Sequence, residues 1–337
     1  MAHLPHDGGS GKPSGTARGP SAGERILESG DSPFPGGRQF AFTILDDTDD
    51  SRVENTRPIY DLLAELGFRT TKTVWPVACP EGSREFFAGA TMAEPDYRAW
   101  CLTLPERGFE LTWHCATMES STRERTVKGL EAFREAFGGY PEIHANHALN
   151  RENIYWGHRR YRTPWRWVAS LAMESQPYEG EVEGSPYYWG DLCQRHIRFT
   201  RNFAFARVNT LSADPEMPYR LESTPFVQYW FSATDVPDLR TFNRLMTPAS
   251  LDRLAEERGV CLMATHLGKG FVRDGRVDRQ AESTLRHLAR LPGWFVPVSE
   301  LLEYLVQKGK GRRRGWWSLA RLEGKHLLDR VRSRLWQ

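Results

Sequence analysis

Acidic side chains follow a short apolar run near the start of the chain, where they could bind a metal ion. Residues 40–45 are mostly apolar and β-prone, and they lead directly into Asp46, Asp47, Asp49 and Asp50. The run predicts a buried strand. Carboxylates this close repel one another and lose hydration, and a divalent cation would offset both costs. The alternative is a solvated acidic turn before a helix.

Four further side chains stand at the ends of other apolar runs. They are Trp75, His114, His147 and His266. In parallel α/β folds the carboxyl ends of the strands meet at one edge, and sites gather there. A carboxylate and imidazoles from different strands can form an open metal site with one position left for water. A metal lowers the pKa of its bound water from 15.7 to about 7.

The pair Asp46 and Asp47 offers two carboxylates for two tasks. Adjacent side chains on a strand diverge, so one could bind the ion while the other faces the reacting water. That second carboxylate would take the proton of the water, and a separate histidine would protonate the leaving group. The sequence therefore indicates hydrolysis at a metal centre.

Strands and helices alternate from residue 39 to residue 306, which predicts a parallel α/β architecture. Composition agrees with a soluble globular protein of one large or two ordinary domains, with 337 residues of which 26% are charged. The expected strands are 39–45, 70–75, 109–113, 141–147, 259–265 and 294–298, with weaker ones near 167–172 and 202–209. The expected helices are 56–66, 95–106, 121–137, 248–258, 278–291 and 299–306.

The two ends of the chain differ from this body. Residues 1–37 are rich in Gly, Ser and Pro and predict a disordered leader without a signal peptide. The five cysteines include no CxxC pair, and no apolar run is long enough to span a membrane, so we expect a cytoplasmic protein.

Residues 307–337 predict a basic linker and an amphipathic helix. From Lys308 onward ten Lys and Arg stand against two acids, and Trp316 and Trp317 precede the helix. Such a helix could lie on an anionic membrane surface, here the inner face, or dock on the barrel through its apolar stripe. No base-reading motif indicates a nucleic-acid partner. His158, His196, His287 and His326 are expected on the surface.

Over residues 38–306 the chain resembles the polysaccharide deacetylase (NodB-like) superfamily. Residues 42–47 are similar to the first motif of that family, Thr-Phe-Asp-Asp-Gly, and residues 108–114 to its Gly-His-Glu stretch ending in histidine. Residues 262–266 resemble its last motif, Leu-x-Leu-His. The resemblance implies a distorted (β/α) barrel that holds a divalent metal, with zinc as the expected ion.

The resemblance also implies roles for single residues. Asp46 would be the catalytic base, Asp47 and His114 metal ligands, and His266 the general acid. The chain departs from the family at three places: Thr48 replaces the motif glycine, Met118 stands where the second metal histidine is expected, and the Arg-x-Pro-Tyr motif is missing. We expect His147 as the third ligand, with His144, Asp49 and Asn146 as alternatives.

The function expected from these residues is the metal-dependent removal of an N- or O-acyl group from a sugar, in cell-surface polysaccharide metabolism. Trp75, Asn146 and Trp156 are the expected substrate-binding residues, since aromatic rings stack on sugar faces. The alternative is a barrel without activity that binds glycans or acts as a scaffold. A different hydrolysis on the same barrel stays open as a third option, because a fold does not fix the reaction.

Overall fold

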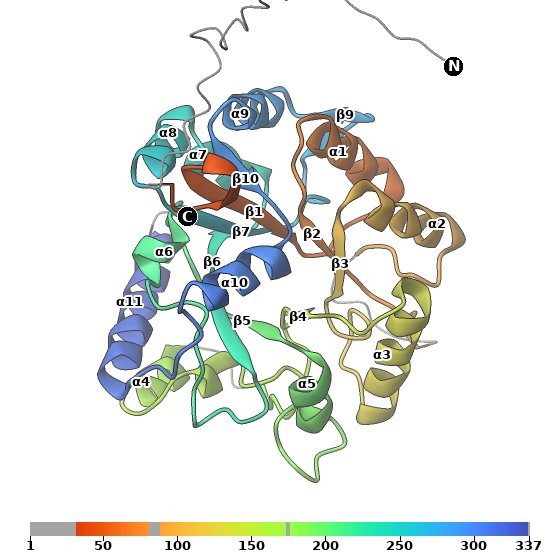
Figure 1. The fold of residues 1–337 in the computed structure, drawn as a ribbon. Coiled ribbons are helices and arrows are strands. Elements are labelled where there is room, and N and C mark those ends of the chain that lie inside the picture. Colours follow the sequence, from red (N-terminus) through yellow and green to blue (C-terminus); the bar gives the residue numbers. More distant parts are fainter. Residues whose placement is uncertain (1–31, 81–87, 173–175, 336–337) are drawn as a thin grey trace, which may run out of the picture. The chain divides into compact units, whose positions relative to one another are not determined.

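The computed structural model describes residues 32–80, 88–172 and 176–335, so most of the expected leader lies outside the described residues. Seven parallel strands close into a barrel in the order β1 to β7, with β7 pairing back onto β1 (Figure 1). The predicted (β/α) barrel is confirmed. The strands are β1 (Phe40–Asp46), β2 (Thr71–Val74), β3 (Glu110–Trp113), β4 (Ile143–His144), β5 (Phe199–Phe205), β6 (Tyr229–Val236) and β7 (Val260–Thr265).

An eighth parallel strand completes the sheet beside β1. Strand β10 (Gly293–Phe295) pairs with the first half of β1, and β2 pairs with its last two residues. Every residue of β1 and β7 is buried. Burial on both faces explains why these strands read as continuous apolar runs rather than as alternating ones.

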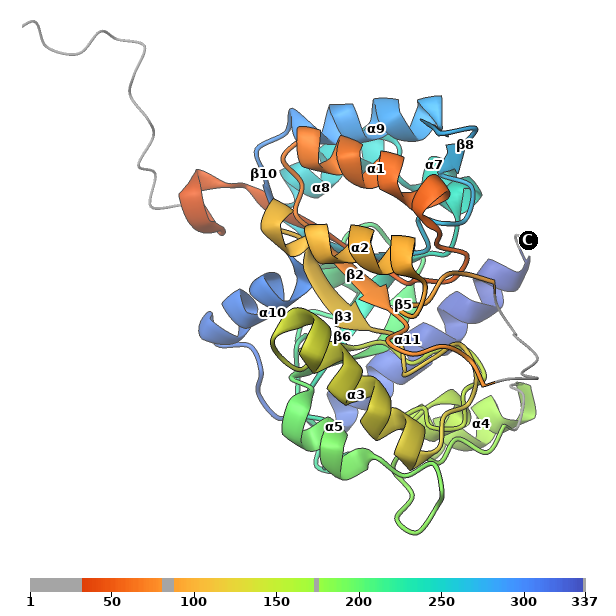
Figure 2. The ribbon, with the colours of Figure 1, turned by 90° about the vertical axis from the view of Figure 1, so that its right-hand side faces the viewer.

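Helices surround the barrel, as Figures 1 and 2 show. They are α1 (Val53–Glu65), α2 (Pro95–Thr103), α3 (Arg123–Phe137), α5 (Gly190–His196), α6 (Thr210–Ala213), α7 (Leu239–Leu245), α8 (Pro248–Glu256), α9 (Arg279–Ala289) and α10 (Val298–Gln307). Helix α3 buries Leu130 and Phe133 on one stripe and ends at Gly138, whose φ of 80° suits a residue without a side chain. A small hairpin of β8 (Val272–Arg273) and β9 (Arg276–Val277) precedes α9.

The middle of the chain differs from the prediction. Residues 167–172, expected as a strand, belong to helix α4 (Trp165–Ala172), and the strand expected at 202–209 begins earlier as β5. Strand β6 was not predicted, although Tyr229-Trp-Phe is strongly β-prone. Helix α4 does carry a helical pattern, because its two polar residues, Arg166 and Ser170, stand four positions apart on one face. Its apolar residues include the buried Ala169 and the exposed Trp167 and Leu171.

The C-terminal helix α11 (Trp316–Leu335) docks on the barrel against β5 and α4 (Figure 2). Leu319 and Leu322 bury their side chains at this contact. His326, expected on the surface, is only 2% exposed, because it faces the barrel and shares a hydrogen bond of 2.7 Å with the Tyr161 hydroxyl. Among the described residues, the structure contains no helix with the length and apolarity needed to cross a bilayer.

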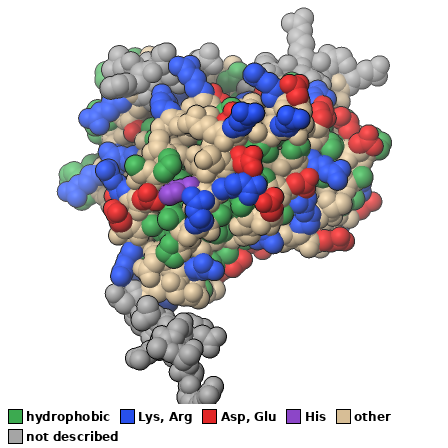
Figure 3. All heavy atoms as spheres, turned by 90° about the horizontal axis from the view of Figure 1, so that it is seen from above, with side chains coloured by type: hydrophobic (Ala, Val, Ile, Leu, Met, Phe, Trp, Pro, Cys, Tyr) green, Lys and Arg blue, Asp and Glu red, His purple; other side chains and the backbone are tan. Residues whose placement is uncertain are grey.

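The face seen from above carries charges of both signs close together (Figure 3). On α9, Arg286 lies between Glu65 of α1 and Glu282, 2.9 Å from each, and His287 contacts Asp252 of α8. Interspersed charges of this kind are typical of a solvent-facing surface.

Candidate metal centre

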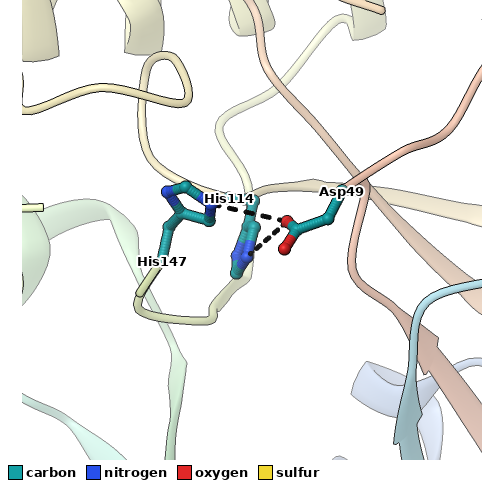
Figure 4. A group of neighbouring side chains, drawn as sticks. All are labelled: Asp49, His114 and His147. Atoms are coloured by element: carbon teal, nitrogen blue, oxygen red, sulfur yellow. Dashed lines mark ion pairs between the residues drawn. The ribbon is translucent and has the colours of Figure 1, made fainter. Parts of the chain in front are cut away.

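A buried triad of one carboxylate and two imidazoles lies at the carboxyl edge of the barrel (Figure 4). Asp49 follows β1, His114 ends β3 and His147 lies just beyond β4. The carboxylate Oδ1 of Asp49 is 3.6 Å from Nε2 of His114 and 3.5 Å from Nε2 of His147. Ligands of a tetrahedral zinc ion, each about 2.0–2.1 Å from the metal, lie about 3.3–3.5 Å apart. The two distances to Asp49 are close to this spacing, and all three ligand atoms lie within 4.8 Å of one another, so the triad could hold a metal ion.

Both histidines are held with Nε2 toward Asp49. The Nδ1 of His114 is 2.8 Å from the carbonyl oxygen of Ala145, and the Nδ1 of His147 is 3.1 Å from Oδ1 of Asn150. A carbonyl oxygen only accepts, so Nδ1 carries the proton of His114 and Nε2 keeps its lone pair. Burial lowers the pKa of His114 to about 4, so this imidazole is neutral at neutral pH, as a metal ligand must be.

Further hydrogen bonds hold these ligands and their partners in place. Asn150 donates from Nδ2 to Glu152, whose other oxygen accepts from the backbone N–H of Ser121. The indole N–H of Trp75 donates to the carbonyl of His114 at 3.0 Å. Trp75 is fully buried, so its ring offers no face to a sugar and instead fixes the end of β3. Its expected role in substrate binding therefore has no support in its position.

Asp46, the expected base, lies outside the pocket. Its side chain is fully buried, and its carboxylate contacts Nζ of Lys72 at 3.0 Å, the hydroxyl of Tyr60 at 3.0 Å and the backbone N–H of Leu267 at 2.8 Å. Lys72 is also fully buried. Asp46 thus joins β1 to β2, α1 and the end of β7, and its oxygens face those partners rather than the triad.

Asp47, the expected metal ligand, pairs with an arginine instead. Its two oxygens accept from the two terminal nitrogens of Arg201 on β5, at 3.1 and 2.7 Å. Burial opposes its charge, but Arg201, His114 and His266 outweigh burial and lower the pKa of Asp47. The carboxylate therefore stays ionised beside the triad. The structure places Asp49, which was an alternative in the sequence analysis, closer to the two histidines.

His266 lies on the other side of Asp49. Its Nδ1 is 2.7 Å from the carbonyl oxygen of Pro237, so Nδ1 carries a proton and Nε2 is the atom that faces the site. This Nε2 is 3.4 Å from Oδ2 of Asp49. Burial opposes protonation of His266, but its hydrogen bond to the Asp49 carboxylate and the charge of Asp47 raise its pKa. Lys269 approaches the same Asp49 oxygen at 3.3 Å.

These groups open into a cavity of about 290 Å³. It brings together Asp47, Asn146, His114, His147, Trp156 and His266 from the sequence analysis, but neither Asp46 nor Trp75. Asn146 accepts a hydrogen bond from the backbone N–H of Ile154, donates one to the carbonyl of the same residue and contacts His144, so its amide shapes the loop after β4. The polar and charged lining residues that were not among the expected site residues are Arg160, Arg201, Asn202, Asp235, Lys269, His326 and Arg330.

A larger hollow of about 840 Å³ lies between α1 and α2. Its walls contain no histidine or cysteine, and its charged side chains include Arg52, Arg57 and Glu94. The chemistry therefore concentrates in the smaller cavity at the strand ends, which is the usual position of active sites in (β/α) barrels.

The fold and this cavity define a (β/α) barrel whose pocket contains side chains that could hold a metal ion. The solved structures similar to it include a Mycobacterium smegmatis protein assigned as a polysaccharide deacetylase, with 13% identity over 84% of this chain and 95% of that chain, and a TM-score of 0.47. PuuE allantoinase shares 10% identity over 85% of this chain and 98% of that chain, with a TM-score of 0.48. The peptidoglycan deacetylase PdaC of Bacillus subtilis shares 12% identity over 80% of this chain and 94% of that chain, with a TM-score of 0.39.

No protein-family model and no curated protein sequence matches the chain. At identities this low, similarity in structure does not establish a reaction. The function is therefore argued from the geometry of the pocket.

Proposed function

We propose that this protein is a metal-dependent hydrolase that removes an N- or O-acyl group from a sugar. The observation that carries the proposal is the triad of Asp49, His114 and His147 beside an ionised Asp47 and a histidine whose Nε2 faces the same space. The triad would hold the ion, with zinc as the expected metal. When bound, the ion would lower the pKa of its bound water and polarise the acyl carbonyl.

Asp47 and His266 are positioned to move protons. Arg201 holds both oxygens of Asp47 in place and keeps them charged, so this carboxylate can accept the proton of an attacking water. His266 can donate from Nε2 to the leaving nitrogen or oxygen, because Pro237 occupies its Nδ1. In this proposal, Asp49 takes the ligand role expected for Asp47, and Asp47 takes the base role expected for Asp46.

Asn202 is a candidate for holding the substrate. It lines the cavity, it is 4% exposed, and its Oδ1 has no hydrogen-bond partner among the described residues. An unsatisfied buried acceptor costs stability unless a ligand donates to it. An amide N–H or a sugar hydroxyl would satisfy it.

The alternative of an inactive scaffold rested on Met118, which stands where a second metal histidine is expected. Met118 is buried, and His147 reaches Asp49 from the end of β4 instead. Because the third donor comes from another strand, the methionine no longer favours the scaffold.

The metal content of an Asp49→Ala variant tests the proposal. We expect the wild type to hold about one metal ion per chain by elemental analysis and to release acetate from N- or O-acetylated sugars. Asp49→Ala should lose both, and Asp50→Asn, which changes the neighbouring acid outside the triad, should keep both. Stoichiometric metal in a folded Asp49→Ala variant would contradict the assignment.

We also propose that the outer face of α4 and α11 meets an anionic membrane surface. The two helices are neighbours, and they expose Trp167, Leu171 and Trp317 by 67%, 72% and 75%. Arg166 and Arg321 are exposed on the same helices. Exposed aromatic and aliphatic side chains with arginines beside them are typical of a surface that lies in the headgroup region of a bilayer.

A further inference from the structure

The C-terminal helix contributes to the wall of the candidate active site. His326 and Arg330 of α11 line the same cavity as Asp47 and His266, and Arg160 joins them from the short 3-10 helix Gly157–Arg160. The basic tail, which the sequence presents as a separate segment, is therefore part of the pocket.

His326 shares this wall with Arg160 and with Arg330, which stands four residues further along α11. The imidazole of His326 is fixed by Tyr161 through Nδ1 and packs on Phe203, with 4.5 Å between the ring centres. Burial, followed by the charges of Arg160 and Arg330, lowers the pKa of His326 well below its usual value. His326 is thus neutral and adds no charge to this wall.

Arg160 is oriented by stacking. Its guanidinium carbon lies 3.7 Å from the centre of the Trp156 ring, and its buried Nε has no hydrogen-bond partner among the described residues. Burial lowers the pKa of Arg160 to about 10, so the group still carries its charge at neutral pH. A stacked, desolvated guanidinium keeps its in-plane N–H donors available for an anion.

The charges that line the pocket do not balance. The carboxylates are Asp47, Asp49 and Asp235, and the cations are Arg160, Arg201, Lys269 and Arg330, which gives 4 − 3 = +1 before any ion binds. Arg201 is matched by Asp47. Burial raises the pKa of Asp235, which weakens it as a partner for the arginines around it. A bound divalent cation would add to the positive excess.

We propose that the pocket accepts a sugar that carries an anionic group, a carboxylate or a phosphate, and that Arg160 and Arg330 contact this group. The inference rests on the proposed function for the sugar and acyl part of the substrate, but the anion subsite itself requires no hydrolysis. Arginine suits both anions, since its planar fork pairs with two oxygens at once. Because α11 supplies Arg330, the tail is a specificity element of the site.

Binding measurements test this directly. N-acetylglucosamine, N-acetylglucosamine 1-phosphate and glucuronic acid would be titrated into the metal-loaded wild type by calorimetry. We expect at least one anionic sugar to bind about tenfold more tightly than the neutral one, with an advantage that shrinks as salt is added. Comparison of the phosphate with the carboxylate identifies which anion fits.

Four variants localise the effect. Arg330→Gln and Arg160→Gln should each remove most of the tenfold preference, Arg330→Lys should restore part of it, and Arg321→Gln, on the exposed side of α11, should leave it unchanged. Thermal unfolding shows whether each variant is folded. Equal binding of neutral and anionic sugars by the wild type, or an equal loss in Arg321→Gln, would overturn the subsite. Retention of anion preference without acetate release would instead reject the proposed function and leave the subsite standing.

Discussion

Breaking the ion pair of Lys72 and Asp46 tests whether the role of Asp46 is structural or catalytic. Both side chains are fully buried, with Nζ 3.0 Å from Oδ2. Replacing Lys72 by Met keeps the volume but leaves a buried carboxylate without its counter-charge. Removal of one partner of such a pair costs about 3–5 kcal/mol. The hydrogen bonds from Tyr60 and Leu267 remain, so we expect the lower half of this range.

Urea unfolding of the wild type, Lys72→Met and the double variant Lys72→Met/Asp46→Leu measures the effect. The double variant should recover much of the loss, because an apolar pair of similar volume replaces the ion pair. The variant Asp46→Asn should remain folded in part, keep its metal and retain most of its turnover per folded molecule. A loss below about 1 kcal/mol in Lys72→Met, or an inactive but fully stable Asp46→Asn, would refute the structural role.

Three further predictions follow from the supports of the site and from the tail. Asn150→Leu removes the acceptor for Nδ1 of His147, so metal affinity should fall about 10- to 100-fold in a chelator competition; unchanged affinity would show that the support is dispensable. Burial raises the pKa of Glu152 from 4.5 to about 7, so the folded state binds this proton more tightly than the unfolded state does. The free energy of unfolding should therefore fall by up to about 3 kcal/mol as pH rises from 4.5 to about 7. Glu152→Gln should flatten this part of the pH profile in urea unfolding, and parallel profiles would contradict the assignment. Trp317→Ser should weaken sedimentation with anionic vesicles severalfold while Val127→Ser on α3 should not, and equal losses would exclude the proposed surface.

The barrel could be predicted because its longest strands are buried on both faces. A strand was expected at 259–265, and β7 spans Val260–Thr265. A short uninterrupted apolar run is typical of a strand that is buried on both faces. Strand β4 is only two residues long, and the run 141–147 gave no sign of where pairing stops. The strand expected at 167–172 was wrong because the apolar residues there resemble a buried strand, whereas Arg166 and Ser170, four residues apart, have the spacing of one helical face.

The site could be predicted in part. The histidines were expected because each ends a predicted strand, and the barrel brings His114, His147 and His266 to one edge. Arg201 and Arg330 could not be identified in the same way. Arg201 lies within β5 and becomes the partner of Asp47 only because the sheet closes. Arg330 depends on where α11 docks, which no local pattern in the tail determines.

Which role each acid near β1 can take depends on the side of the chain that it faces, and this side alternates with a period of two residues. Contacts alternate beyond the end of the strand: Asp46 and Thr48 face Tyr60 and Tyr97, on the helices outside, while Asp47 and Asp49 face the pocket. Adjacent acids diverge, and this was the reason for giving Asp46 and Asp47 different tasks.

The same divergence argues against Asp46 as the base and Asp47 as the metal ligand. A base and a metal ligand that act on one water must lie on one side of the chain, so they are expected two residues apart. Since all residues of β1 are buried, its apolar pattern cannot reveal which side faces inward. That information comes from the partners, Lys72 for Asp46 and Arg201 for Asp47, and both partners lie on other strands.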